Sequence, residues 1–123
     1  MADYDRQEGA EMKIVEKPWG HEEWLVVNDH YVMKKLVVNP GQKLSLQYHE
    51  RKMETMYCVK GTGQLQMEGK FIPMLAGVFY TINPGEIHRL VAGKHKLVII
   101  ECSTPELEDV VRLEDDYFRK TKE

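Results

Sequence analysis

Four polar side chains in the middle of the sequence are of types that can ligate a metal ion. Gln47, His49 and Glu54 lie close together between two glycines, and His88 follows a Pro-Gly pair much later. Two imidazoles, a carboxylate and an amide oxygen form a mixed shell that suits divalent Zn, Mn, Fe, Co or Ni without choosing among them. A divalent metal ion held from one side keeps positions open for substrate oxygens, where it can polarise a carbonyl or stabilise an enediolate.

These four residues come from two distant stretches, so only a fold that joins the stretches makes them one site. Residues two apart in a strand point the same way, which places Gln47 and His49 on one face of the segment 44–49. We expect a turn over residues 50–53 and a new strand from Glu54, so that His49 and Glu54 meet across a hairpin. His88 must then lie on a strand that crosses the same interior.

Short apolar runs with frequent turn residues between them predict an all-β protein. Strand candidates cover residues 24–27, 31–38, 44–49, 56–60, 65–67, 71–75, 78–82, 88–91 and 97–101, with a hairpin signal at Glu68-Gly69-Lys70. Many short strands at this spacing are typical of a sandwich or barrel. A proline after a capping residue at Thr104-Pro105 predicts a helix start. We expect the charged tail from Leu107 to Arg119 to pack on the outside of the barrel.

Length, charge and cysteine usage exclude several classes of protein. A chain of 123 residues predicts one domain, with a flexible arm over residues 1–12 and a barrel domain over residues 13–123. A net charge of −3 without a basic run argues against nucleic-acid binding, and no apolar stretch is long enough for a membrane span. The N-terminus has no apolar signal core, so we expect a cytoplasmic protein in which Cys58 and Cys102 are reduced and pack as small hydrophobes.

The spacing of the candidate ligands resembles the pattern of the cupin superfamily. That pattern runs from a glycine through His-x-His and Glu to a second glycine, and here it reads Gly41, Gln47-Tyr48-His49, Glu54 and Gly61, followed by Gly77 through Pro84-Gly85 to His88. Gln47 in place of the first histidine is similar to the type II phosphomannose isomerase group, which includes the C-terminal domain of bifunctional mannose-1-phosphate guanylyltransferases. Members also resemble this chain in Lys17-Pro18-Trp19-Gly20, in Pro40 to His49 and in Asp109 to Tyr117.

The resemblance implies a single-domain, cupin-type jelly-roll barrel and a metal-dependent sugar-phosphate isomerase of the mannose-6-phosphate isomerase kind. It implies a divalent metal ion held by Gln47, His49, Glu54 and His88. Phosphate needs cationic donors, and three cations match family positions of like charge, which makes them the expected substrate-binding residues. These are Lys34, Lys52 and Arg112.

An aldose–ketose isomerase moves a proton between C1 and C2 of a sugar phosphate, a step that a carboxylate of suitable pKa can perform. Glu54 is the first candidate for this catalytic role, and Glu101, on the last strong strand, is the second.

Two other functions remain open at this point. The same barrel and ligand types can hold Fe in a metal-dependent oxygenase, and a non-catalytic sugar-binding module is also compatible with the sequence. Three cations favour the isomerase, because an oxygenase acting on an apolar substrate would not need them. Since cupin-like barrels commonly pair across a two-fold axis, we also expect a homodimer.

Overall fold

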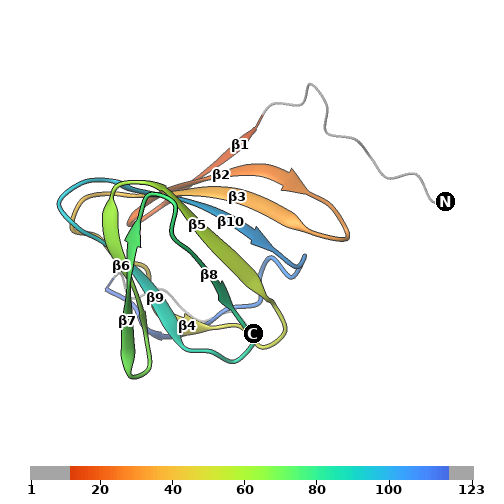
Figure 1. The fold of residues 1–123 in the computed structure, drawn as a ribbon. Coiled ribbons are helices and arrows are strands. Elements are labelled where there is room, and N and C mark those ends of the chain that lie inside the picture. Colours follow the sequence, from red (N-terminus) through yellow and green to blue (C-terminus); the bar gives the residue numbers. More distant parts are fainter. Residues whose placement is uncertain (1–11, 117–123) are drawn as a thin grey trace.

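The computed structural model describes residues 12–116, which form two antiparallel sheets facing each other (Figure 1). The strands are β1 (Lys13–Lys17), β2 (Gly20–Val27), β3 (Val32–Val38), β4 (Leu46–Tyr48), β5 (Glu54–Lys60), β6 (Thr62–Met67), β7 (Lys70–Leu75), β8 (Phe79–Ile82), β9 (His88–Ala92), β10 (Leu97–Ser103) and β11 (Val111–Glu114). Sheet A has the order β1-β2-β3-β10-β5-β8, and sheet B has the order β11-β4-β9-β6-β7.

The prediction of an all-β fold is confirmed, whereas the helix expected to start at Thr104 is wrong. Turns and a short bridge occupy residues 104–110. The Thr104 hydroxyl accepts a hydrogen bond from the backbone N–H of Met53 at 3.0 Å, so it does not cap a helix of its own segment. The described residues contain no helix, and hence none that could span a membrane.

The expected position of the tail is also wrong for its described part. β11 pairs with β4 as the edge strand of sheet B, and Leu107 and Val110 line a pocket. Leu107 and Val110 therefore face the pocket and do not cover the outside of the barrel, whereas Leu113 on β11 is 49% exposed. Residues 117–119 of this tail and residues 1–11 of the predicted arm lie outside the described residues.

Inward-facing side chains change from polar to apolar along the strands that enclose the interior. Alternate residues of a strand share a face, so each polar residue has an apolar one two positions along on the same side. The buried pairs are Lys34 and Leu36 on β3, Glu54 and Met56 on β5, His88 and Leu90 on β9, and Glu101 and Ile99 on β10. The apolar halves pack into a core that closes one end of the barrel, and the polar halves line the other end.

Two turns depend on glycine. Gly61, between β5 and β6, has a φ of +95°, and a Cβ atom there would collide with the carbonyl oxygen of Lys96. Gly69 has a φ of +72° in the hairpin between β6 and β7, which confirms the hairpin predicted at Glu68-Gly69-Lys70. Glycine adopts this conformation without steric cost.

His49 and Glu54 do not meet across a hairpin, contrary to our expectation. β4 pairs with β9 and β11 in sheet B, while β5 pairs with β8 and β10 in sheet A. Residues 49–53 therefore cross from one sheet to the other. The two side chains approach each other across the interior between the sheets.

The two cysteines differ in environment, although both are free thiols. Cys58 is fully buried in the core, as predicted. Cys102 is exposed, so the expectation that it packs as a small hydrophobe is wrong. The reason is alternation, because Cys102 lies between the inward-facing Glu101 and Ser103 on β10 and therefore points outward.

Candidate metal centre

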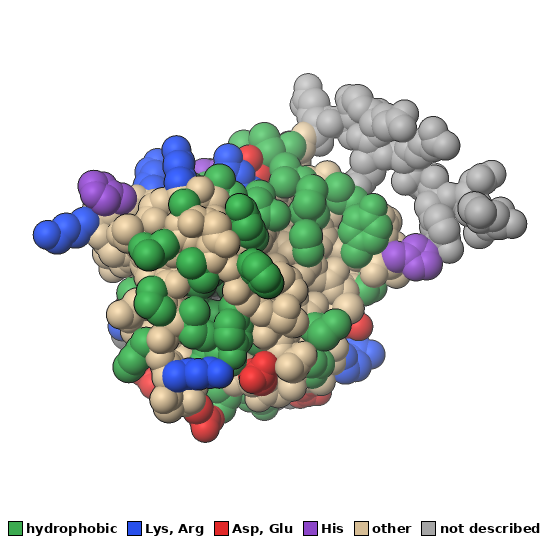
Figure 2. Space-filling view, viewed as in Figure 1, with side chains coloured by type: hydrophobic (Ala, Val, Ile, Leu, Met, Phe, Trp, Pro, Cys, Tyr) green, Lys and Arg blue, Asp and Glu red, His purple; other side chains and the backbone are tan. Residues whose placement is uncertain are grey.

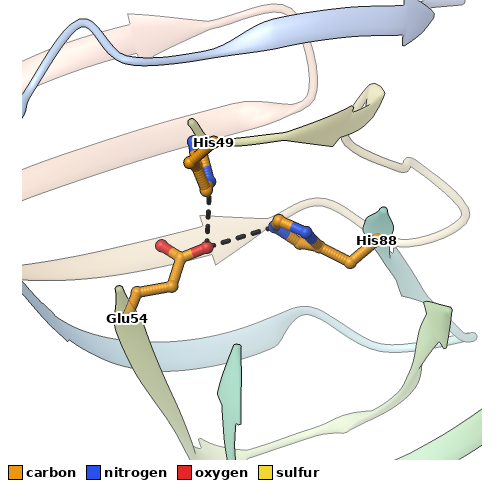
Figure 3. Close-up of side chains that lie close together, drawn as sticks. All are labelled: His49, Glu54 and His88. Atoms are coloured by element: carbon orange, nitrogen blue, oxygen red, sulfur yellow. Dashed lines mark hydrogen bonds and ion pairs between the residues drawn. The ribbon is translucent and has the colours of Figure 1, made fainter. Parts of the chain in front are cut away.

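His49, Glu54 and His88 converge at the polar end of the barrel (Figure 3). His49 directly follows β4, Glu54 begins β5 and His88 begins β9. Nε2 of each histidine lies 3.1 Å from the same Oε1 atom of Glu54. The three side chains are 1–3% exposed, and their potential ligand atoms all lie within 4.8 Å of one another.

The ring protons of both histidines are used outside this cluster. Nδ1 of His49 contacts the backbone carbonyl of Asp109, and Nδ1 of His88 lies 2.8 Å from the carbonyl of Glu86. A carbonyl only accepts, so each Nδ1 donates its proton, and a ring that carries only this proton presents a lone pair at Nε2. Two lone pairs then face one carboxylate oxygen, an arrangement that a cation between them stabilises. The donor set therefore fits a divalent metal ion.

Glu54 is held ionised by its neighbours. Burial opposes ionisation, but the nearby Lys52 ammonium holds the pKa of Glu54 well below its usual value. Nζ of Lys52 lies 3.5 Å from Oε2, the oxygen that neither histidine contacts. An ionised carboxylate with one oxygen directed at two imidazoles is the form that a metal ion requires.

Gln47, the fourth predicted ligand, lies beside His88 on the neighbouring strand. The two residues are cross-strand partners between β4 and β9, and Arg112 of β11 pairs with Gln47 on its other side. Cross-strand partners have their Cβ atoms about 5 Å apart on the same face of a sheet. Gln47 and Arg112 both line the pocket, and Oε1 of Gln47 accepts a hydrogen bond from the Ser45 hydroxyl at 2.6 Å.

A pocket of about 350 Å³ lies beside this cluster and reaches it at His49. Its sheet B wall contains Gln47, His49 and Arg112. Its sheet A wall contains Trp24, Lys34 and Glu101, which follow one another as cross-strand partners on β2, β3 and β10. This volume is at the lower end of the range for small-molecule sites, and the lining mixes aromatic and charged groups.

Glu101 differs from Glu54 in the direction in which its pKa is shifted. Burial and the neighbouring Glu54 carboxylate raise the pKa of Glu101 to about 7, against the opposing effect of Lys52. Nζ of Lys52 lies 3.7 Å from Oε2 of Glu101, so one ammonium group bridges the two carboxyl groups. A carboxyl group that titrates near neutral pH and lines a pocket can both release and accept a proton.

The structure brings all the predicted site residues to this end of the barrel, where Lys34 and Lys52 contact acidic side chains. Lys34 lies 3.3 Å from Oε1 of Glu22 and 4.6 Å from the ring centre of Trp24. Lys52 contacts Glu54 and Glu101. Arg112 lines the pocket from the opposite sheet.

Sequence reasoning missed Glu22 and Asp109. Glu22 lies two residues before Trp24 on β2, and it accepts a hydrogen bond from the Trp24 indole at 2.9 Å. Its position on the inner face of a strand was the available signal. Asp109 belongs to the tail motif that resembles the isomerase group, but its contacts join residues 57 to 60 positions apart in the sequence. No local pattern predicts such contacts.

Two facing antiparallel sheets with a His–Glu–His cluster at one end define a cupin-type barrel. The chain belongs to the family described as "Mannose-6-phosphate isomerase C-terminal", whose pattern it matches over residues 4–115. This confirms both the fold and the family inferred from the ligand spacing.

Similar proteins support this assignment. The chain is 32% identical over 104 residues to a mannose-1-phosphate guanylyltransferase of Sinorhizobium fredii, covering 81% of this chain and 20% of the relative. It is 33% identical over 118 residues to the enzyme of the same name from Escherichia coli, covering 93% of this chain and 25% of the relative. The chain thus spans a quarter or less of the length of these relatives.

The fold also agrees with a solved structure. An RmlC-like cupin from Shewanella frigidimarina superposes with a TM-score of 0.71 at 20% sequence identity, covering 82% of this chain and 90% of that protein. At this identity the likeness shows the fold alone.

Proposed function

We propose that this chain is a metal-dependent sugar-phosphate isomerase that interconverts an aldose and a ketose phosphate through an enediolate. One observation carries the proposal: His49, Glu54 and His88 converge with both ring protons turned away, beside a pocket that also holds a second carboxyl group and several cations. Gln47, beside His88, is the proposed fourth ligand. A divalent cation held by these residues would supply charge stabilisation for the enediolate.

The two predicted catalytic carboxylates have different roles in this proposal. Glu54 presents Oε1 to both histidines and Oε2 to Lys52, so its lone pairs are committed. Glu101 is not among the three converging ligands, and it lines the pocket. We therefore assign the proton transfer between C1 and C2 to Glu101 and metal ligation to Glu54.

The cations of the pocket support a phosphorylated substrate. Lys34 and Lys52 line the pocket and contact acids, so they contribute to its local potential. Arg112 lines the pocket on the wall opposite Lys34. A guanidinium group can bind two phosphate oxygens at once, which makes Arg112 the proposed primary phosphate contact.

The test is a panel of hexose and pentose phosphates incubated in D₂O with the metal-reconstituted protein and followed by NMR. The expected result is deuterium at C2 of one sugar phosphate together with the appearance of its ketose isomer. The Glu101→Gln variant keeps the size of the side chain but cannot carry the proton, so it should bind the same sugar without exchange. Binding of a sugar phosphate by the wild type without exchange would instead indicate a sugar-binding module, and oxygen uptake with Fe bound would indicate an oxygenase.

We also propose that two copies of the chain pair through the outer face of sheet A. The outer face of sheet A carries no charged side chain over the central parts of three neighbouring strands. Its outward-facing residues there lie between Thr55 and Val59 on β5, Phe79 and Thr81 on β8, and Val98 and Cys102 on β10. Tyr57 and Phe79 are cross-strand partners there and are 45% and 67% exposed. Figure 2 shows hydrophobic side chains over much of the visible surface, with charges mainly along its margins. An uncharged apolar face can meet its own copy without burying a charge.

Light scattering during size-exclusion chromatography tests this pairing. Phe79→Lys should convert a dimer to a monomer, because it places a charge in the interface. Phe71→Lys is the matched control, since Phe71 is 66% exposed but lies on β7 of sheet B. A monomeric wild type, or dimers that survive Phe79→Lys, would exclude this face as the interface.

We place the protein in the cytoplasm, a proposal supported by two free thiols.

A further inference from the structure

The segment that connects the two sheets is held by hydrogen bonds from the C-terminal part of the chain. The carboxylate of Asp109 accepts hydrogen bonds from three consecutive backbone N–H groups, those of Glu50, Arg51 and Lys52, at 3.0, 2.7 and 2.9 Å. The next N–H group, that of Met53, is held by the Thr104 hydroxyl. Four successive amides between His49 and Glu54 are thus fixed by two residues far away in the sequence.

Asp109 also contacts the candidate metal centre through its backbone. Its carbonyl oxygen accepts the Nδ1 proton of His49, which leaves Nε2 directed at Glu54. The carboxylate and the carbonyl belong to one residue, so the three amide bonds that fix its side chain also fix the position of its carbonyl. The hydrogen bonds are strong enough for the amides to lower the pKa of Asp109 against the opposing effect of partial burial.

The two candidate histidine ligands differ in how their rings are oriented. His88 donates to the carbonyl of Glu86, two residues away in the same segment, so its ring is fixed locally. His49 donates to a carbonyl 60 residues away, so its ring orientation depends on the docking of residues 104–110. A loss of that docking would release His49 and leave His88 in place.

We propose that Asp109 is a positioning residue for the metal centre, which orients His49 through its carbonyl and the connection 50–52 through its carboxylate. The functional meaning of this inference rests on the proposed metal-dependent function. The contacts of Asp109 themselves are present in the metal-free chain. Partners that orient a ligating histidine tune metal affinity by about 10–100-fold when they are removed. Asp109 also holds the backbone N–H of Lys52. One residue therefore positions both the ligand His49 and the cation that pairs with Glu54.

The experiment compares histidine tautomers in metal-free wild type and Asp109→Asn by long-range ¹H–¹⁵N NMR, with His49 and His88 assigned from their Gln variants. The wild type should show both rings protonated at Nδ1. In Asp109→Asn the charge is lost and an NH₂ group meets backbone donors, so His49 should become a mixture of tautomers while His88 stays unchanged. Co²⁺ affinity, followed by visible absorption, should fall by at least about tenfold.

Thr104→Val is the matched control, because it removes a hydrogen bond from the same connection without touching His49. It should lower the melting temperature but leave the His49 tautomer unchanged. An unchanged His49 in Asp109→Asn, or an equal change in His88, overturns the proposal. If Asp109→Asn does not fold, Asp109→Ser, which keeps one acceptor, gives the same comparison. A wild type that binds no Co²⁺ contradicts the proposed function, while the tautomer comparison still decides the role of Asp109.

Discussion

Nζ of Lys52 lies 3.5 Å from Oε2 of Glu54, and the two residues are only 7% and 1% exposed to solvent. Burial works against the charge on each of them, yet Lys52 lowers the pKa of Glu54, and Glu101 together with Glu54 raises the pKa of Lys52. Lys52 therefore serves first as the internal counter-ion of the proposed metal ligand. This role differs from the phosphate-binding role that its position in the family pattern implies.

Replacing Lys52 by Met should lower the free energy of unfolding of the metal-free protein by about 3–5 kcal/mol, because it leaves a buried carboxylate without its cation. Lys35→Met is the control. Lys35 also contacts an acid, Glu23, at 3.9 Å, but its side chain is 37% exposed, so about 1 kcal/mol or less is expected. Urea unfolding monitored by circular dichroism measures both values. An equal decrease in unfolding free energy in the two variants would show that the buried Lys52 ion pair stabilises the protein no more than the partly exposed one.

Much of this fold follows from local patterns in the sequence. Glycine at positions 61 and 69, alternation along β10, and the spacing of Gln47, His49 and Glu54 predict turns, faces and candidate ligands. The change from Glu101 to Ile99 along one face could also be read directly, since residues two apart share a side. These features depend on short-range steric rules that each segment obeys by itself.

The remaining features depend on contacts between distant segments. Residues 104–110 have the composition of a helix start. The side-chain oxygens of Thr104 and Asp109, however, accept hydrogen bonds from the backbone N–H groups of residues 50–53. These long-range hydrogen bonds hold the connection between β4 and β5, which lie in different sheets. His49 and Glu54 therefore meet between the sheets and not in a hairpin. Competition of this kind is decided by tertiary structure, which a single sequence does not display.

The raised pKa of Glu101 predicts that the metal-free protein loses stability as the pH rises. Its pKa is about 7 in the folded protein, whereas the usual value of 4.5 applies in the unfolded chain. The folded protein therefore holds the proton more tightly. The stabilisation is complete below pH 4.5 and disappears as the pH approaches 7. Glu101→Gln keeps a neutral group beside Glu54, Lys52 and Lys34, so it should lack this decline. The difference between pH 5 and pH 8 in unfolding free energy should exceed about 1 kcal/mol. Parallel pH profiles for the two proteins would exclude Glu101 as the titrating group.

Removal of one proposed ligand should abolish tight metal binding without unfolding the barrel. His88→Gln replaces a buried imidazole of the cluster, whereas His95→Gln changes an exposed residue outside it. Calorimetric titration with Zn²⁺ or Co²⁺ should give about one ion per chain for the wild type and for His95→Gln, and an affinity at least 100-fold lower for His88→Gln. The metal should also raise the melting temperature of the wild type, since a ligand that binds only the folded state stabilises it. Retention of wild-type affinity by His88→Gln would place the metal elsewhere.

The role assigned to Arg112 predicts discrimination between phosphorylated and free sugars. Arg112 is the cross-strand partner of Gln47 and lines the pocket, so its guanidinium group can reach a substrate that contacts the metal centre. Arg112→Gln should weaken binding of the preferred sugar phosphate by about 10–100-fold, since a hydrogen bond to a charged group contributes about 1.5–3 kcal/mol. Binding of the corresponding unphosphorylated sugar should hardly change. Arg51→Gln, which alters an exposed arginine that does not line the pocket, is the control and should leave both affinities as they are. A uniform loss of affinity for both sugars in Arg112→Gln would mean that Arg112 shapes the pocket and does not read the phosphate.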